Sequence, residues 1–176
     1  MENPLINIET NRLMLSPLKQ QHWPLFLRLH TEAQIVALCF DVPPQDMIRQ
    51  KFAARLKPWT PDSDNWLGLV VTDKASGAEL GVTGLQLQDG VAEVGYLFLP
   101  QFYGKGYAAE SLQGLINWAT DTQQINRYQA VVTEGNAASE KVLTKCGFAL
   151  KHIAPNAHNI GGKYFADHIY QLQLQR

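Results

Sequence analysis

Residues 101–109 read Gln-Phe-Tyr-Gly-Lys-Gly-Tyr-Ala-Ala, and this is the most informative stretch of the sequence. It follows an apolar and aromatic run that stops at Pro100, and it opens a segment whose apolar residues recur at helical spacings of three and four. A strand that turns through two glycines into a helix directs several backbone N–H groups at one point, where the helix N-terminus adds partial positive charge. The stretch therefore predicts an anion site, and Gly104 and Gly106 let a pyrophosphate come close to the backbone.

The composition favours a single compact domain, which we place over residues 1–176. The chain has 45% hydrophobic residues and a formal net charge of −1, so its charge gives no reason to expect binding to nucleic acid or to a membrane surface. Cys39 and Cys146 lie far apart in apolar patterns, which is typical of small core residues in a reducing compartment. The first seven residues lack the features of a signal peptide, and no apolar run nears the roughly 20 residues that span a bilayer. We expect a cytoplasmic protein.

The hydrophobic pattern predicts helices and strands in an order that fits an α+β fold. Helical spacings cover residues 19–37, residues 45–57, the segment after the glycine turn, and residues 136–145, after which Gly147 stops the helix. Strand patterns cover residues 10–15, 66–72, 80–87, 91–99, 128–133, 148–153 and 165–174, with a hairpin turn at Asp89-Gly90. This order predicts a mixed, mostly antiparallel, twisted sheet flanked by helices.

Two other interpretations of the glycine turn start from the same residues. Gly104, Gly106 and Ala109 satisfy the G-x-G-x-x-A form of the dinucleotide-binding fingerprint, with Glu134 as the acidic residue that would end the second strand. The antiparallel meander before the turn and the short remaining chain argue against that Rossmann interpretation. A P-loop is excluded, because no Gly-Lys-Ser/Thr follows four residues after a glycine. The glycines can also make a tight strand-to-helix turn that binds no ligand.

A second motif lies about thirty residues after the turn, where Asn136-Ala-Ala-Ser139 starts a helix that ends in Lys145-Cys-Gly147-Phe148. Together the two motifs resemble the pyrophosphate loop and the Asn-x-x-Ser/Ala signature of the GNAT superfamily of acyl-CoA-dependent N-acetyltransferases. Residues 9–15, 92–97 and 162–168 are similar to the branch that contains ribosomal-protein-alanine and -serine N-acetyltransferases. The resemblance covers nearly the whole chain, and it implies a GNAT-like fold.

The resemblance implies acetyl-CoA as the cosubstrate, held between the strand that ends at Leu99 and the strand that ends at Thr133. Its pyrophosphate would lie on the N–H groups of the glycine turn, and its pantetheine arm would pair with the backbone of residues 97–99 as an added strand. Asn136 offers a side-chain amide to the same arm, and it is equally suited to cap its own helix. The residues expected to bind the cofactor are Leu97, Phe98, Leu99, Gln101, Tyr103, Gly104, Lys105, Gly106, Tyr107, Ala108, Asn136 and Ser139. No metal site is expected.

Acetyl transfer needs a neutral amine, so a base must take a proton directly or through water. The resemblance places Glu93 on the central strand, facing the acceptor side, as the leading candidate; a solvated or ion-paired glutamate is the alternative. His158, in the polar segment 155–162 before the last strand, is the second candidate, and an exposed loop histidine is its alternative. A backbone N–H near Leu99 would stabilise the oxyanion.

This chain differs from many superfamily members at the position that supplies their general acid. They carry a tyrosine seven residues after the motif asparagine, and this chain has Leu143 there. Ser139 is the nearest alternative acid, and water is the next. Ser139 can equally be a serine on the helix surface with no such role. An alkyl thiolate with a pKa near 8.5 is also a tolerable leaving group without an acid. Cys146 has no paired histidine evident, so we expect direct transfer rather than a covalent intermediate.

The acceptor implied by the branch is the N-terminal amine of a protein, including a ribosomal protein. A small amine, such as a polyamine, an amino acid or an antibiotic, fits the same chemistry. A non-catalytic acyl-CoA-binding domain is a third class, which the absent tyrosine keeps open. The exposed terminal strand is compatible with a homodimer.

Overall fold

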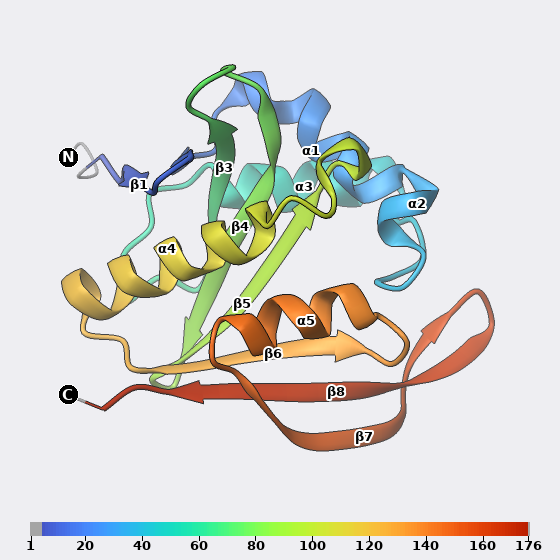
Figure 1. The fold of residues 1–176 in the computed structure, drawn as a ribbon. Helices are drawn as coiled ribbons and strands as arrows, with labels where there is room; N and C mark the ends of the chain where they lie inside the picture. Colours follow the sequence, from blue (N-terminus) through green and yellow to red (C-terminus); the bar gives the residue numbers. More distant parts are fainter. Residues whose placement is uncertain (1–4, 176) are drawn as a thin grey trace.

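The computed structural model describes residues 5–175, and one twisted sheet with helices on both faces organises them (Figure 1). The strands are β1 (Ile8–Glu9), β2 (Leu13–Pro17), β3 (Leu67–Asp73), β4 (Glu79–Gln88), β5 (Val91–Phe98), β6 (Arg127–Thr133), β7 (Ala149–Ile160) and β8 (Lys163–Gln173). The α-helices are α1 (Trp23–Thr31), α2 (Ala33–Val36), α3 (Gln45–Arg55), α4 (Tyr107–Gln123) and α5 (Ala137–Lys145). Two short 3₁₀ helices, η1 (Gln20–His22) and η2 (Pro100–Phe102), precede α1 and the glycine turn.

The sheet has the strand order β1-β2-β3-β4-β5-β6-β8-β7. All neighbouring pairs are antiparallel except β5 and β6, which are parallel and share only the pairs Ala92–Tyr128 and Glu93–Gln129. Beyond these pairs the two strands diverge, so that the sheet splits in the shape of a V (Figure 1). The predicted α+β class and the mixed, mostly antiparallel sheet are confirmed.

The split sheet also decides against the Rossmann interpretation, which needs a continuous parallel sheet. The acidic residue that this interpretation requires has a structural contact instead. The side-chain oxygen Oε1 of Glu134 accepts a hydrogen bond from the backbone N–H of Ala166 on β8, at 2.8 Å. Glu134 thus joins the end of β6 to the neighbouring strand.

Two hydrophobic cores lie on opposite faces of the sheet. Helices α1, α2 and α3 cover one face with side chains such as Phe26 and Phe52. Helices α4 and α5 cover the other face with side chains such as Leu115 and Leu143. Alternate residues of a strand point to opposite faces, and Val70 of β3 accordingly belongs to the first core while its neighbours belong to the second. The split between β5 and β6 therefore opens between two well-packed layers.

The single helix expected over residues 19–37 is wrong, because η1, α1 and α2 replace it. Pro24 lies in the first turn of α1, where its missing N–H costs no helical hydrogen bond. Glu32 takes an extended conformation, with φ −70° and ψ 120°, and separates α1 from α2. The apolar spacing continues across these breaks, so spacing alone predicted one helix.

The strand expected over residues 10–15 begins three residues later, at Leu13. A tight turn occupies residues 10–13 instead. The backbone N–H of Thr10 donates to the carbonyl oxygen of Leu13 at 2.9 Å, and the N–H of Leu13 donates to the hydroxyl of Thr10 at 3.0 Å. This turn joins β1 to β2.

The polar segment expected as a loop over residues 155–162 is also wrong, because β7 continues to Ile160. Its pairing with β8 shifts between Ala154 and His158, around Pro155, which has no N–H to donate, and Asn156, which has a φ of 51°. A proline and a bulge are tolerated here because β7 is the edge strand of the sheet. His158 therefore lies on a strand. An exposed edge can pair with a second copy, and the expected homodimer stays a prediction.

The helices among residues 5–175 are all too short or too polar to cross a membrane. The expectation about a signal peptide concerns the first seven residues, and residues 1–4 lie outside the described part of the chain.

Candidate functional site

A cavity of about 610 Å³ opens where β5 and β6 diverge. Strand β5 contributes residues 94–98 and β6 contributes residues 130–133, which are the parts beyond their short parallel pairing. Residues 102–104 and 106–109 line a second side, and α5 with Asn136 lines a third. Residues 34, 35 and 37–39, in and after α2, complete the lining. The two sequence motifs, far apart along the chain, thus meet at one cavity.

The glycine turn brings the N-terminus of α4 to this cavity. Gly104 has a φ of 76° and Gly106 a φ of 80°, a left-handed conformation that side-chain-bearing residues adopt only with strain. Gly106 is the N-cap residue of α4 and has no side chain, so it leaves the amides of the first turn uncapped. Tyr107 and Ala108 of that turn line the cavity. These amides and the helix N-terminus suit an anionic group.

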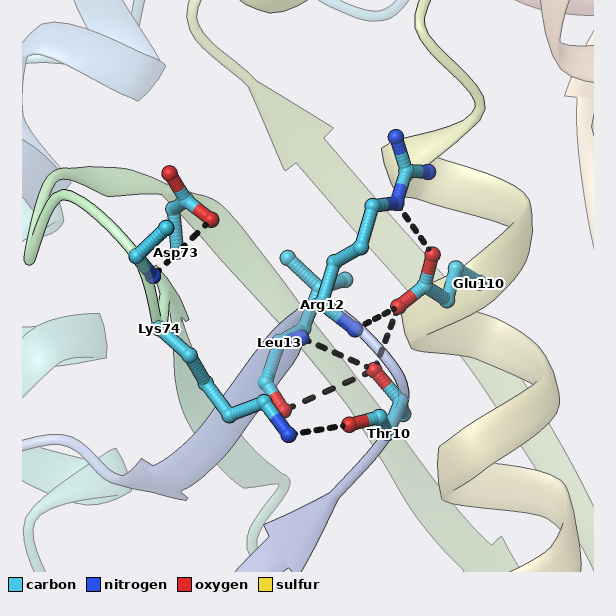
Figure 2. Close-up of polar contacts among 7 residues, drawn as sticks. Thr10, Arg12, Leu13, Asp73, Lys74 and Glu110 are labelled. Atoms are coloured by element: carbon cyan, nitrogen blue, oxygen red, sulfur yellow. Dashed lines mark hydrogen bonds and ion pairs between the residues drawn. The ribbon is translucent and has the colours of Figure 1, made fainter.

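Arg12, close to the N-terminus of the chain, lies beside the glycine turn. Arg12 is held there by Glu110 of α4, whose carboxylate accepts hydrogen bonds from Arg12 Nε at 2.7 Å, from Arg12 N at 2.8 Å and from the hydroxyl of Thr10 at 2.6 Å (Figure 2). The Arg12 guanidinium carbon lies 4.3 Å from the ring centroid of Tyr107. Its nitrogen Nη2 lies 3.5 Å from the point that a Cβ on Gly106 would occupy. Arg12 thus adds a fixed positive charge to the turn.

Sequence reasoning did not assign a role to Arg12. The residue lies within the stretch 9–15 that carried the branch resemblance, but nothing along the chain indicates that this stretch contacts α4. Lys145, at the end of α5, is a second cation near the turn, with its Nζ 3.8 Å from the same point beside Gly106. The sequence shows that both residues are basic, but it does not show that they lie beside the glycine turn.

Most of the residues expected to bind the cofactor line the cavity. These are Leu97, Phe98, Tyr103, Gly104, Gly106, Tyr107, Ala108, Asn136 and Ser139. Leu99, Gln101 and Lys105 are not among the lining residues. Leu99 is buried in the core under α1–α3, Gln101 is exposed on η2, and Lys105 Nζ lies 6.0 Å from the ring centroid of Phe102.

At the end of β5, the backbone N–H groups point alternately toward β4 and toward the split. The N–H of Leu99 donates to the carbonyl oxygen of Leu80 at 2.9 Å, so it is already used and does not face the cavity. In an antiparallel ladder the N–H groups of successive residues point to alternate sides. The N–H groups of Phe98 and Tyr96 therefore point away from β4, toward the split. The N–H of Leu99 is therefore not available to a group in the cavity, and Phe98 is the adjacent residue whose N–H faces the split.

The start of α5 forms a small polar cluster on the cavity wall. Asn136 caps the helix, because its side-chain oxygen accepts a hydrogen bond from the N–H of Ser139 at 3.3 Å. The Ser139 hydroxyl oxygen lies 2.7 Å from the hydroxyl oxygen of Tyr96 on β5. Leu143, at the position of the family tyrosine, is fully buried and also lines the cavity. The tyrosine hydroxyl on this wall is thus that of Tyr96 on β5, which the sequence analysis did not single out.

Glu93 lies at the apex of the split, in the last residue pair that β5 shares with β6. Its neighbours Ala92 and Val94 pack in the core under α4, so Glu93 faces the side of α1–α3. The cavity lining begins one residue later, at Val94. Burial raises the pKa of the Glu93 carboxyl above its ordinary value, which brings it closer to the range that suits a general base.

His158 has contacts of a different kind. Its Nε2 lies 2.7 Å from the carbonyl oxygen of Cys39, and a carbonyl only accepts, so Nε2 donates. The N–H of Gly161 donates to a carboxylate oxygen of Asp41 at 2.8 Å. The two hydrogen bonds join the β7–β8 hairpin to the segment after α2. His158 is not among the residues that line the cavity, and these contacts favour a structural role.

The family described as "Acetyltransferase (GNAT) domain" matches residues 12–149 of this chain. The chain belongs to this family, as the two sequence motifs predicted. It is 31% identical over 93 residues to YjdG, an uncharacterized N-acetyltransferase from Bacillus subtilis, and covers 55% of that protein. It is 28% identical over 101 residues to p20, an uncharacterized N-acetyltransferase from Bacillus licheniformis, and covers 56% of it. The chain thus spans a little more than half the length of the curated relatives it matches.

Solved structures of acetyltransferases share the fold over nearly the whole chain. RimL, a ribosomal L7/L12 α-N-protein acetyltransferase, has a TM-score of 0.82 at 20% identity, over 97% of this chain and 95% of that one. A spermidine N-acetyltransferase from Vibrio cholerae, in complex with CoA and spermine, has a TM-score of 0.80 at 16% identity, over 93% and 96%. A GNAT-family acetyltransferase from Bacillus anthracis has a TM-score of 0.81 at 16% identity, over 96% and 98%. At these identities the likeness shows the fold alone.

Proposed function

We propose that this protein transfers the acetyl group of acetyl-CoA to the N-terminal α-amine of a protein, by direct attack of the amine. The observation that carries the proposal is the cavity at the split between β5 and β6, with the uncapped N-terminus of α4 on its wall. Membership of the GNAT family and the CoA in a fold neighbour support it.

The residues around the cavity fit the parts of acetyl-CoA. The amides at the start of α4, with Arg12 and Lys145 nearby, suit its pyrophosphate. The free backbone edge of β5, at Tyr96 and Phe98, suits its pantetheine amides, because an extended chain can pair with an unpaired strand edge. When bound, acetyl-CoA would supply a thioester carbonyl as the electrophile.

Two groups of this chain serve the attack of the amine. Glu93 takes the amine proton through a water molecule, because it lies at the apex of the split rather than in the cavity lining. The N–H of Phe98 donates to the oxyanion that develops on the thioester carbonyl.

The acceptor side of β5 supports a peptide acceptor rather than a polyamine. The Trp66 ring covers Gly95, since a Cβ there would lie 3.4 Å from the ring, and the guanidinium carbon of Arg55 lies 5.2 Å from the centroid of that ring. Within residues 5–175, Arg55 Nε is buried and has no hydrogen-bond partner. A buried cation at this place repels a polycation, whereas a peptide can offer carbonyl oxygens to it.

The test measures thiol release from acetyl-CoA with three acceptors. These are a lysine-free peptide with a free N-terminus, the same peptide with a formylated N-terminus, and spermidine. We expect release with the free peptide, none with the formylated one, and kcat/KM for spermidine at least about tenfold lower, which corresponds to about 1.4 kcal/mol. The melting temperature with saturating acetyl-CoA reports cofactor binding independently of the acceptor.

The other outcomes identify the alternatives. Faster release with spermidine would establish a small-molecule amine acetyltransferase. Binding of acetyl-CoA without release for any amine would establish a non-catalytic acyl-CoA-binding domain. The absence of binding would overturn the proposal as a whole.

A further inference from the structure

A hydroxyl pair crosses the wall of the cavity from β5 to α5. The hydroxyl oxygen of Tyr96 lies 2.7 Å from the hydroxyl oxygen of Ser139 and 3.2 Å from the carbonyl oxygen of the same residue. Both residues line the cavity, and Tyr96 packs against the core under α4 and α5. The tyrosine is therefore held by its ring, and its hydroxyl has a fixed partner.

The pair can be connected in two ways, because each hydroxyl has one hydrogen. Tyr96 can donate to the carbonyl oxygen of Ser139 while Ser139 donates to Tyr96. Alternatively, Tyr96 donates to the Ser139 hydroxyl oxygen over the shorter distance, and the Ser139 hydrogen is then free for a group in the cavity. Burial raises the pKa of Tyr96 far above its ordinary value, so Tyr96 keeps its proton at neutral pH and acts as a donor.

A negative charge in the cavity selects the second arrangement. A hydrogen bond from a hydroxyl to an anion is shorter and stronger than one to a neutral acceptor. A chain of two hydroxyls that point the same way strengthens each bond through polarisation. The leaving sulfur of the proposed reaction is such an anion, and Leu143, at the place of the family tyrosine, has no hydroxyl to offer it.

We propose that Tyr96 is a positioning residue that turns the Ser139 hydroxyl toward the sulfur of the departing thiolate. This inference rests on the proposed function, because the thiolate is that of CoA. As the amine nitrogen bonds to the carbonyl carbon, the C–S bond breaks and its electron pair goes to sulfur. Ser139 donates a hydrogen bond to that sulfur while Tyr96 donates to Ser139. The amine proton goes to Glu93 through water, and the thiolate takes up a proton from solvent on release.

The test titrates the thiol of bound CoA through the ultraviolet absorbance of its thiolate. It needs no acceptor amine. Ser139 in the wild-type protein stabilises the thiolate, so we expect the thiol pKa of bound CoA to lie below that of free CoA. The Tyr96→Phe and Ser139→Ala variants are each expected to raise this pKa by about one pH unit, as loss of a hydrogen bond to a charged group implies. The double variant is expected to match Ser139→Ala, since Tyr96 acts only through Ser139.

Three controls isolate the hydroxyl pair. Lys141 and Lys145 also line the cavity and are present in every variant, so any effect of their charge on the thiol cancels in the comparison. Burial raises the pKa of both Cys39 and Cys146, and a titration without CoA subtracts their signal. Tyr128→Phe is the matched variant: its buried hydroxyl contacts Thr120 and two backbone carbonyl oxygens, and it is not among the cavity-lining residues. It is expected to lower the melting temperature without changing the thiol pKa.

Each result decides between the two proposals. A thiol pKa that is the same in wild type, Tyr96→Phe and Ser139→Ala, with CoA bound, overturns the role of the pair and leaves the acetyltransferase proposal intact. If Tyr96→Phe fails to fold, Ser139→Ala still tests the pair, because it leaves the Tyr96 ring in the core and Tyr96 acts only through Ser139; an unchanged thiol pKa in this variant overturns the proposal. Failure of wild-type protein to bind CoA overturns the proposed function instead. In a turnover assay, the expected companion result is a roughly tenfold lower kcat in Tyr96→Phe with KM for acetyl-CoA within about twofold.

Discussion

Glu93 combines a fixed position at the apex of the split with a carboxyl whose pKa burial raises. A general base acts only in its deprotonated form, so a raised pKa moves the acidic limb of the pH–rate profile upward. We expect Glu93→Gln to lower kcat by about 10²- to 10⁴-fold at neutral pH and to remove that limb. The affinity for acetyl-CoA is expected to stay unchanged, because Glu93 does not line the cavity. Initial rates across pH 5–9 with one peptide acceptor measure both effects.

The matched control for Glu93 is Glu134→Gln. It makes the same chemical change in a carboxylate that contacts Ala166 outside the cavity, and it is expected to leave the pH–rate profile intact. An unchanged profile in Glu93→Gln would falsify the assignment of the base. His158→Gln would then be the next variant to measure, because His158 was the second candidate.

Single residues were predictable where a local rule ties residue type to backbone shape. Gly104 and Gly106 have the positive φ that glycine permits, and Asn136 caps the helix that follows it. Tyr96 and Arg12 were not predictable, because their roles come from partners far away in sequence. Tyr96 contacts Ser139 across 43 residues, and Arg12 contacts Glu110 across 98. No spacing along the chain indicates such a pair.

Helix α4 is fixed to the β1–β2 turn by one carboxylate, that of Glu110 (Figure 2). Burial raises the pKa of this carboxyl, but the hydrogen bonds from Thr10 and Arg12 outweigh burial and hold the pKa below its usual value. Because the pKa of Glu110 is lower in the folded state, its carboxylate stabilises the protein at pH values above the unfolded pKa of about 4.3. This stabilisation is lost as the pH falls through the folded pKa. We expect Glu110→Gln to cost about 1–3 kcal/mol at pH 7 and less near pH 3, as measured by urea unfolding.

The control for α4 is Glu32→Gln, which breaks an exposed pair with Arg28 at 3.0 Å one helical turn away. It is expected to cost less than about 0.5 kcal/mol, because solvent screens such pairs. Glu110→Gln should also weaken acetyl-CoA binding, since Arg12 then loses the partner that holds it beside Gly106. Equal stability losses in the two variants would show that the carboxylate of Glu110 is an ordinary surface group.

The order of the helices and strands was more predictable than the residues at which they begin and end. Hydrophobic spacing continues through Glu32, although the backbone there is extended and divides α1 from α2. The polar residues 155–162 suggested a loop, although β8 supplies partners for this part of β7 and the pairing resumes at His158. For β7 the deciding contacts come from β8, whereas at Glu32 the break is a local change of backbone conformation. Local propensity therefore placed these elements but not their ends.

At the level of the molecule, the cavity follows from the sheet rather than from any one segment. The two parallel strands share two residue pairs and then separate, and the space between them holds the ends of both motifs. The sequence order of strands and helices indicated this topology, and the resemblance to a family placed the cofactor in it. The acceptor was not predictable in the same way, because the motifs that carry the resemblance are specific for the cofactor and much less so for the acceptor.

Helix α1 carries a buried histidine that makes the stability of the whole protein depend on pH. His30 is buried between the rings of Phe26 and Phe40, at centroid distances of 4.2 and 5.7 Å, and its Nδ1 donates to the carbonyl oxygen of Phe26 at 2.7 Å. Burial is the largest cause that lowers its pKa to about 4; the nearby cations Lys51 and Arg55 act in the same direction, and the hydrogen bond to Phe26 acts against them. The folded state therefore resists protonation of a side chain that the unfolded state protonates below its ordinary pKa of about 6.5.

The sign of the effect follows from this difference in proton binding. Between about pH 6.5 and pH 4 the unfolded chain binds a proton at His30 and the folded chain does not, so stability falls as the pH falls, by up to about 1.4 kcal/mol per pH unit. We expect His30→Leu to flatten the curve of unfolding free energy against pH in this window. His152→Leu, on the exposed part of β7, is the control and should leave the curve unchanged. Because burial also lowers the pKa of His22, some slope is expected to remain, and the difference between wild type and His30→Leu measures His30 alone. Parallel curves for the two proteins would mean that His30 takes up its proton in the folded state as readily as in the unfolded chain.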